Sequence, residues 1–154
     1  QERLAVGAWN GASHPLLRWA KSGKNDQRFL FIPIPGTNKF RIQTMRDDVH
    51  EQIYLNVDSN GGVNCWAPMN DEKVSQQFEV DFQADLFFVA FREGTKGEFL
   101  DVGPLGNVVR WSGEDGKNDS PKSNQKFILL NPHQVFYEYI SYMGFSASLS
   151  SNCA

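Results

Sequence analysis

Gln27-Arg28-Phe29 is the first of three Gln-x-Phe stretches in this chain, and Gln76-Gln77-Phe78 and Gln125-Lys126-Phe127 are the others. From Gln27 to Gln76 is 49 residues, and from Gln76 to Gln125 is 49 residues again. Self-similarity at a fixed period of this length is typical of repeat architectures. Two equal intervals in succession make chance a poor explanation. We therefore expect three copies of one structural unit.

Apolar positions follow the same 49-residue step. One set is Phe31, Val80 and Leu129, and another is Ile42, Phe91 and Ile140. The first set lies two places after each motif phenylalanine, and alternate residues of a strand point to the same face. We expect these side chains to meet in a shared core.

Each repeat is predicted to form four short strands, because no segment keeps a 3.6-residue apolar period and Gly, Pro and Asn separate the apolar runs. The expected strands are 2–8, 15–19, 27–33, 38–44, 52–57, 62–66, 76–82, 86–91, 98–103, 107–111, 125–130 and 135–143. Three repeats of four strands favour an all-β β-trefoil over a sandwich, and three blades are too few for a propeller.

The 154 residues suit one domain with one core. We divide residues 1–154 into three repeats, approximately 1–48, 49–94 and 95–143, and a tail, 144–154. The tail alternates apolar and small polar residues. We expect it to pair as an edge strand that helps to close the barrel, or else to begin a connection to a further module.

The first half of each repeat also recurs. Tyr54-Leu55-Asn56-Val57 matches Phe99-Leu100-Asp101-Val102, and Leu4-Ala5-Val6 is a poorer copy. An apolar strand that ends in tryptophan follows each of them, at Trp19, Trp66 and Trp111. The differences in length between repeats fall in the connections, where insertions cost little.

With these motifs the chain resembles the ricin-B-type β-trefoil lectins, from about residue 3 to residue 143. It differs in having Phe where that family most often has Trp at the motif ends, and in lacking paired cysteines within the repeats. The resemblance implies carbohydrate binding without cofactor. It also implies that Gln27, Gln76, Gln125 and their phenylalanines are structural.

The resemblance places the sugar acceptor in the Leu-Asp-Val strand, the stacking aromatic at the end of the next strand, and a closing polar residue before the motif glutamine. The third repeat fits best, with Asp101, Trp111 and Asn124. The second offers Asn56, Trp66 and Ser75, and the first Ala5, Trp19 and Asp26. An aromatic face can stack on a pyranose ring, and a carboxylate accepts hydroxyl hydrogen bonds. Ala5 accepts none, so the first site is expected to be weak or lost. The three tryptophans could instead be core residues.

Composition narrows the partners. A formal charge of −3 and a pI of about 5.6 argue against nucleic acid, and no apolar stretch is long enough to predict membrane insertion. Glycans or glycoconjugates are the expected partners, and oligomerisation is open. Cys65 and Cys153 could form one long-range disulfide, although two unpaired thiols are favoured. The compartment, secreted or cytoplasmic, stays open, with secretion slightly favoured.

No catalytic motif occurs, and His14, His50 and His133 have no partners at metal-ligand spacing, so we expect neither an enzyme nor a metal site. Two alternatives to a free-standing lectin stay open. One is the glycan-binding, receptor-binding module of a larger toxin or adhesin. The other is a β-trefoil protease inhibitor that acts through an exposed loop, at 10–16 or 112–124.

Overall fold

The structure is a computed structural model, and it describes residues 2–48, 53–67, 73–82 and 88–130. These residues form an all-β fold in which the only helical segments are four short 3₁₀ turns. The strands are β1 (Glu2–Val6), β2 (His14–Ala20), β3 (Phe29–Pro33), β4 (Lys39–Thr44), β5 (Tyr54–Val57), β6 (Val63–Ala67), β7 (Phe78–Phe82), β8 (Val89–Glu93), β9 (Phe99–Val102) and β10 (Val108–Trp111). Within the described ranges, no helix has the length and apolar character needed to span a bilayer.

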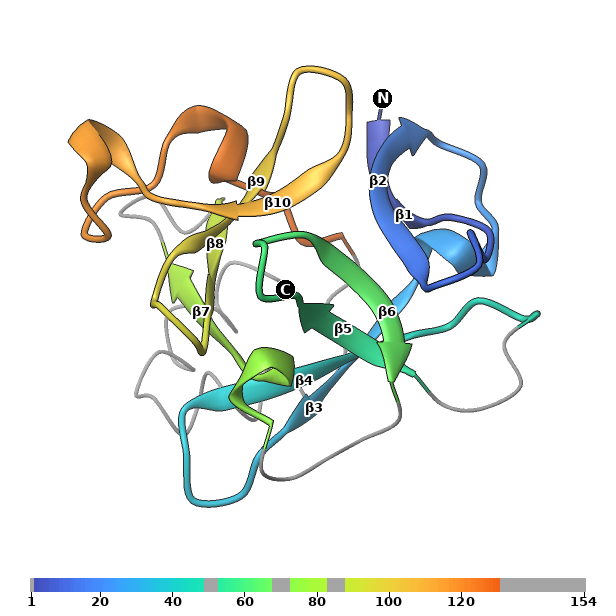
Figure 1. Ribbon diagram of the computed structural model, residues 1–154, viewed down its shortest axis with the longest axis horizontal. Coiled ribbons are helices and arrows are strands. Elements are labelled where there is room, and N and C mark those ends of the chain that lie inside the picture. The colour runs from blue at the N-terminus through green and yellow to red at the C-terminus, as the bar shows by residue number, and fades with distance from the viewer. Residues whose placement is uncertain (1, 49–52, 68–72, 83–87, 131–154) are drawn as a thin grey trace, which may run out of the picture.

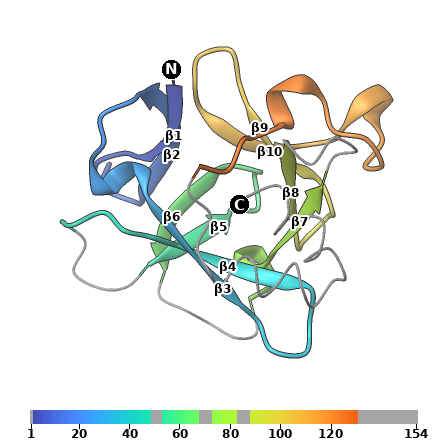
Figure 2. The same ribbon diagram turned by 180° about the vertical axis from the view of Figure 1, so that it is seen from behind.

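The strands pair as five consecutive antiparallel hairpins, β1–β2, β3–β4, β5–β6, β7–β8 and β9–β10. Further antiparallel pairs join the hairpins into the order β1-β2-β6-β5-β4-β7-β8-β9-β10, with β3 on β4. As Figures 1 and 2 show, this brings the β9–β10 hairpin beside the β1–β2 hairpin at the other end of the described chain.

One inter-hairpin contact recurs at the residue before each tryptophan. The amide of Arg18 donates to the carbonyl of Gly106 at 2.7 Å, and the amide of Arg110 donates to the carbonyl of Gly61 at 2.7 Å. Cys65, the third such residue, pairs with His14 where β6 meets β2. The same position in each predicted repeat therefore docks against the hairpin of another repeat.

The core is built from the apolar residues that the 49-residue step selected. Ile42, Val80 and Phe91 are buried, and Phe31 and Leu129 pack against the same cluster. The Phe31 and Phe91 rings stack at 5.9 Å between centroids, and Phe127 lies 5.5 Å from Phe91. Ile140 lies outside the described residues. Residues far apart in sequence thus share one core, as the periodicity predicts.

The motif glutamines are structural, as expected. Nε2 of Gln27 donates to the carbonyl of Ala20 at 2.7 Å, and its Oε1 accepts from the amide of Ser22 at 2.8 Å. Gln125 repeats the pattern with the carbonyl of Ser112 at 2.9 Å and the amide of Lys122 at 2.8 Å. Each glutamine therefore fastens the residue after a tryptophan to the turn that follows.

The predicted strand starts at the motif glutamines are wrong. Each glutamine ends a 3₁₀ turn: η1 (Asn25–Gln27), η2 (Val74–Gln76) and η4 (Ser123–Gln125). Strands β3 and β7 therefore begin two residues after the motif glutamines, at Phe29 and Phe78. At Gln27, side-chain bonds to Ala20 and Ser22 hold the chain in the turn. A further turn, η3 (Glu114–Gly116), lies in the third connecting loop.

Among the described residues, the expected strand at 125–130 is reduced to one bridge. The amide and carbonyl of Phe127 bond to those of Val89, both at 2.8 Å, and the neighbouring residues form no ladder. The segment expected to pair with it, 135–143, lies outside the described residues, as do the tail and Cys153. Cys65 is a buried free thiol, and burial raises its pKa.

Candidate functional site

Asp101 forms the centre of the predicted third-repeat site. It lies on β9 and is 7% exposed. Its Oδ1 accepts from Nδ2 of Asn124 at 2.8 Å, and its Oδ2 accepts from Nε2 of Gln125 at 2.8 Å. Since a carboxylate has about four acceptor positions, these two bonds orient the group and leave capacity for ligand hydroxyls.

Trp111 ends β10 and presents its side chain to solvent, with 57% of it exposed. Val109, two residues earlier, pairs directly with Asp101 across the ladder. Cross-strand partners share a sheet face, and diagonal neighbours lie about 7–8 Å apart, so Trp111 stands on the same face as Asp101.

The core interpretation of the tryptophans is wrong for Trp111, and for Trp19, which is 62% exposed. Both residues lie at or next to the end of a strand, and both side chains are exposed to solvent and not packed in the core. The Trp66 side chain lies outside the described part of the structure. An exposed ring beside an oriented carboxylate is the arrangement that a sugar site needs.

The second repeat has a polar pair at the same positions as the third, but its acceptor is a neutral amide in place of a carboxylate. Oγ of Ser75 donates to Oδ1 of Asn56 at 2.9 Å, at the positions equivalent to Asn124 and Asp101. Nδ2 of Asn56 donates to Oδ1 of Asp58 at 3.1 Å, and Nδ2 of Asn64 donates to Oδ2 at 2.6 Å. The second repeat thus has a carboxylate, Asp58, two residues after the predicted acceptor Asn56.

Sequence reasoning missed Asp58. It stands where Gly7 and Gly103 stand in the other two repeats, so a comparison of the three hairpin turns was the signal that could have found it. The amides of Gly7, Asp58 and Gly103 each close a hairpin turn with bonds of 2.8 Å.

A shallow pocket of about 440 Å³ opens at the second repeat. It lies between the β5–β6 turn, η2, the β8–β9 turn and β10. Its lining residues are Asn56, Val57, Asp58, Ser59, Lys73, Ser75, Thr95, Lys96 and Arg110. The pocket does not include Asp101, so the structure offers a second candidate site apart from the predicted third-repeat site.

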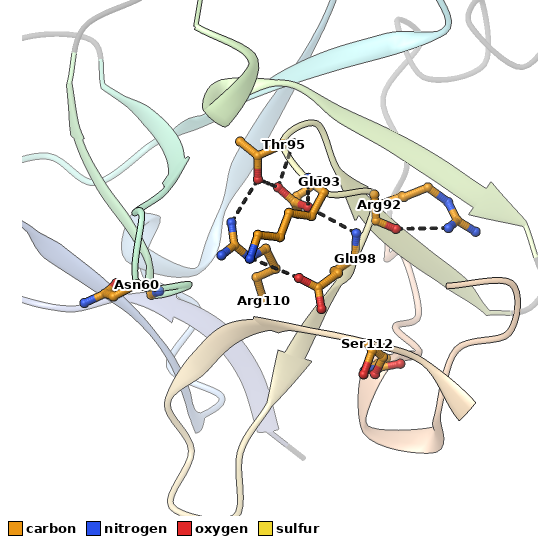
Figure 3. Close-up of polar contacts among 11 residues, drawn as sticks. Asn60, Arg92, Glu93, Thr95, Glu98, Arg110 and Ser112 are labelled. Carbon is orange, nitrogen blue, oxygen red and sulfur yellow. Dashed lines mark hydrogen bonds and ion pairs between the residues drawn. The ribbon is translucent and has the colours of Figure 1, made fainter. Parts of the chain in front are cut away.

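A polar network holds one wall of this pocket (Figure 3). Nη1 of Arg110 donates to Oγ1 of Thr95 at 2.9 Å, and its Nε lies 3.3 Å from Oε1 of Glu98. Glu93 is 2% exposed and accepts from the Thr95 hydroxyl and from the amides of Thr95, Lys96 and Glu98. Burial opposes ionisation of Glu93, but these hydrogen bonds outweigh it and hold its pKa below the usual range.

The first repeat lacks the polar pair. Ala5 is buried and offers no acceptor. Asp26, at the donor position, has a buried Oδ1 with no hydrogen-bond partner in the described structure. Of the predicted sets, the structure joins Asp101 to Asn124, with Trp111 on the same sheet face, and joins Asn56 to Ser75. It leaves Asp26 without its counterpart. Throughout the described ranges, no group of three or more His, Cys, Asp or Glu residues is arranged to hold a metal ion.

No protein-family model matches the sequence, and no curated protein matches it. Solved structures do. The designed threefold-symmetric protein ThreeFoil superposes with a TM-score of 0.65 at 18% identity, over 84% of this chain and 91% of that one. A mosquitocidal holotoxin gives 0.67 at 13% identity over 86% of this chain, and a Polyporus squamosus lectin bound to a sialylated epitope gives 0.62 at 14% over 81%.

This chain has a β-trefoil fold. It spans 16% of the holotoxin chain and 42% of the lectin chain, so in both cases it corresponds to one part of a longer protein. At identities this low, the similarity establishes the fold alone. The activity has to be argued from the residues of the site.

Proposed function

We propose that this protein binds carbohydrate and performs no chemistry on it, and that its fold is three repeats of four strands. The third repeat carries the principal site. Asp101 accepts hydrogen bonds from vicinal hydroxyls, Trp111 stacks on the apolar face of the ring, and Asn124 closes the site and contributes a carbonyl oxygen.

The observation that supports this proposal is the oriented Asp101 carboxylate beside an exposed tryptophan. Two amides, from Asn124 and Gln125, fix the carboxylate at 2.8 Å each. A preorganised acceptor loses little entropy on binding, which is how a shallow site reaches useful affinity. The side chain of Trp111 is 57% exposed, so its ring is available to stack on a sugar.

A glycan array tests the proposal. The unmodified protein should bind a subset of glycans, and Asp101→Ala and Trp111→Ala should each weaken that binding by about tenfold or more. Leu105→Ala is a matched control, because Leu105 is a 95% exposed apolar residue at the tip of the same hairpin, away from Asp101. Absence of any glycan ligand for the folded protein would refute carbohydrate binding.

The glycan-binding module of a larger toxin is the second candidate. It is favoured by the similarity to one part of the mosquitocidal holotoxin, of which this chain spans 16%. The site chemistry would be the same, with the glycan carried on a target cell. Binding of labelled protein to cells, which glycosidase treatment of the cells abolishes, would support this form of the proposal.

The protease-inhibitor alternative is less well supported. The loop 112–124 is fastened to itself, with the amide of Glu114 donating to the carbonyl of Ser120 at 2.7 Å and that of Lys117 to Glu114 at 2.9 Å. The carbonyl of Asn118 also accepts from Arg92. An inhibitory loop must reach a protease cleft, whereas this loop folds back on its own domain. A protease panel separates the two functions.

A further inference from the structure

The second-repeat pocket has an unusual balance of donors and acceptors. Oδ1 of Asn56 already accepts from Ser75, and both oxygens of Asp58 accept from Asn56 and Asn64. The remaining charged groups that line it are donors only: Lys73, Lys96 and Arg110. Asp58 keeps some acceptor capacity, but the three cationic side chains outnumber it, so this lining favours a ligand that supplies acceptors.

Arg110 is the buried charged residue of this lining. The residue is 9% exposed, and two side-chain contacts engage it in the described structure, Nη1 with Thr95 and Nε with Glu98. A guanidinium has five N–H donors, so others of this group are open to a ligand in the pocket. Charge-assisted bonds from a part-buried guanidinium are among the stronger polar contacts.

Among the described residues, two acidic groups lie close to the pocket without lining it, and Glu98 offsets part of the charge of Arg110. Glu98 pairs with Arg110 and Glu93 is saturated by the β8–β9 turn, and neither lines the pocket. The lining itself carries three basic residues and one acid, Asp58. The third-repeat site is the opposite, because its charged group is an acceptor.

We propose that the second-repeat pocket binds the acid group, carboxylate or sulfate, of an acidic saccharide. This inference rests on the proposed carbohydrate function, since Asn56 and Ser75 occupy the positions of Asp101 and Asn124. Arg110 contacts the acid group from the pocket floor, and Lys73 and Lys96 contact it from the rim. Asn56 and Ser75 contact the ring hydroxyls.

Matched pairs of glycans test the inference. Each neutral core is a galactoside, glucoside, mannoside or N-acetyllactosamine. It is presented plain, as a sulfate ester, and extended with a sugar acid, and each acidic form is paired with the plain form of the same core. The acidic member of each bound pair should bind about tenfold or more tightly than the neutral one. Inorganic sulfate should compete with the acidic members alone, and the sulfated and carboxylated arms show which acid group is preferred.

Variants locate the effect. Arg110→Gln should remove about tenfold to a hundredfold of affinity for the acidic members, and Lys96→Gln about two- to fivefold, with neutral members unchanged. Lys126→Gln, an exposed lysine outside the pocket, is the matched control and should change neither. If Arg110→Gln fails to fold, the Lys73→Gln/Lys96→Gln double variant decides.

The outcomes separate this inference from the function beneath it. Neutral glycans that bind in an Asp101-dependent way, with no preference for acidic members, would overturn the acidic pocket and leave carbohydrate binding intact. An acid preference that is undiminished by substitution of Arg110, or by substitution of both lysines, would also overturn it. Failure to bind any glycan would refute both proposals.

Discussion

Substituting Asp101 by alanine should change both stability and binding, by amounts that the contacts predict separately. The variant removes the acceptor of two amide donors, Nδ2 of Asn124 and Nε2 of Gln125. Asn124 is exposed, so water replaces the lost bond at little cost. Gln125 is 0% exposed, and the N–H of its Nε2 that bonds to Asp101 is left without an acceptor inside the protein.

The stability loss should therefore come from Gln125. A buried donor without a partner costs about 1–3 kcal/mol, and in a domain of this size each kcal/mol lowers Tm by about 2–4 °C. We expect Tm to fall by roughly 2–12 °C. Affinity for glycan should fall by about tenfold to a hundredfold, because charge-assisted bonds to hydroxyls are worth about 1.5–3 kcal/mol.

Trp111→Ala supplies the contrast. The side chain is 57% exposed, so its loss should move Tm by no more than about 2 °C. A sugar that covers about 60–80 Å² of the ring, at about 25 cal/mol/Å², stabilises the complex by about 1.5–2 kcal/mol, which is about tenfold to thirtyfold in affinity. Calorimetric melts and titrations measure both quantities. Glycan affinity unchanged in both variants would refute the site.

Three further perturbations test the framework around the site. Gln125→Ala should cost about 2–3 kcal/mol in urea unfolding, more than Gln27→Ala, because Gln27 is less buried. The folded pKa of Glu93 lies below the unfolded value of about 4.3, so its stabilisation is present above about pH 4.3 and is lost as pH falls through the folded pKa. Unfolding of Glu93→Gln between pH 3 and 7 should accordingly show a smaller acid loss than the unmodified protein. Deleting residues 144–154, which lie outside the described residues, should lower stability by more than about 0.5 kcal/mol if they form an edge strand, and an unchanged Tm would indicate a linker.

The sequence predicted the fold well because repetition multiplies a weak signal. A single Gln-x-Phe says little, but three at equal spacing align two sets of apolar positions across the repeats, and Ile42, Val80 and Phe91 are buried as that alignment predicts. Strand starts were harder to predict, since a 3₁₀ turn and a strand can both accommodate a glutamine whose side chain bonds to nearby backbone.

The site was only partly predictable, because repeat alignment finds equivalent residues but not the residues of different repeats that face each other. Asp101, Trp111 and Asn124 follow the motif, and the structure shows Asn124 bonded to Asp101 with Trp111 on the same sheet face. The pocket at the second repeat joins Asn56 to Thr95, Lys96 and Arg110, which belong to the third predicted repeat. Repeat alignment compares equivalent positions, and so it contains no information on which residues of different repeats face each other.

The first repeat allows the site chemistry to be rebuilt as a test. Asp26 is an acceptor at a position that donates in the other repeats, and Ala5 provides nothing to pair with. Nε2 of Gln27 bonds to Ala20, whereas Nε2 of Gln125 bonds to both Ser112 and Asp101, so Gln27 has a hydrogen available for a new carboxylate.

The double variant Ala5→Asp/Asp26→Asn recreates the pair of the third repeat beside the exposed ring of Trp19. Titration calorimetry should then show one more glycan site per chain than the unmodified protein. Ala5→Asp alone is the matched control. It sets two carboxylates against each other, so it should lower Tm and add no site. A folded double variant with unchanged stoichiometry would mean that an acceptor, its amide partner and an exposed tryptophan are not sufficient for binding, and the assignment of Asp101, Asn124 and Trp111 would need a further component.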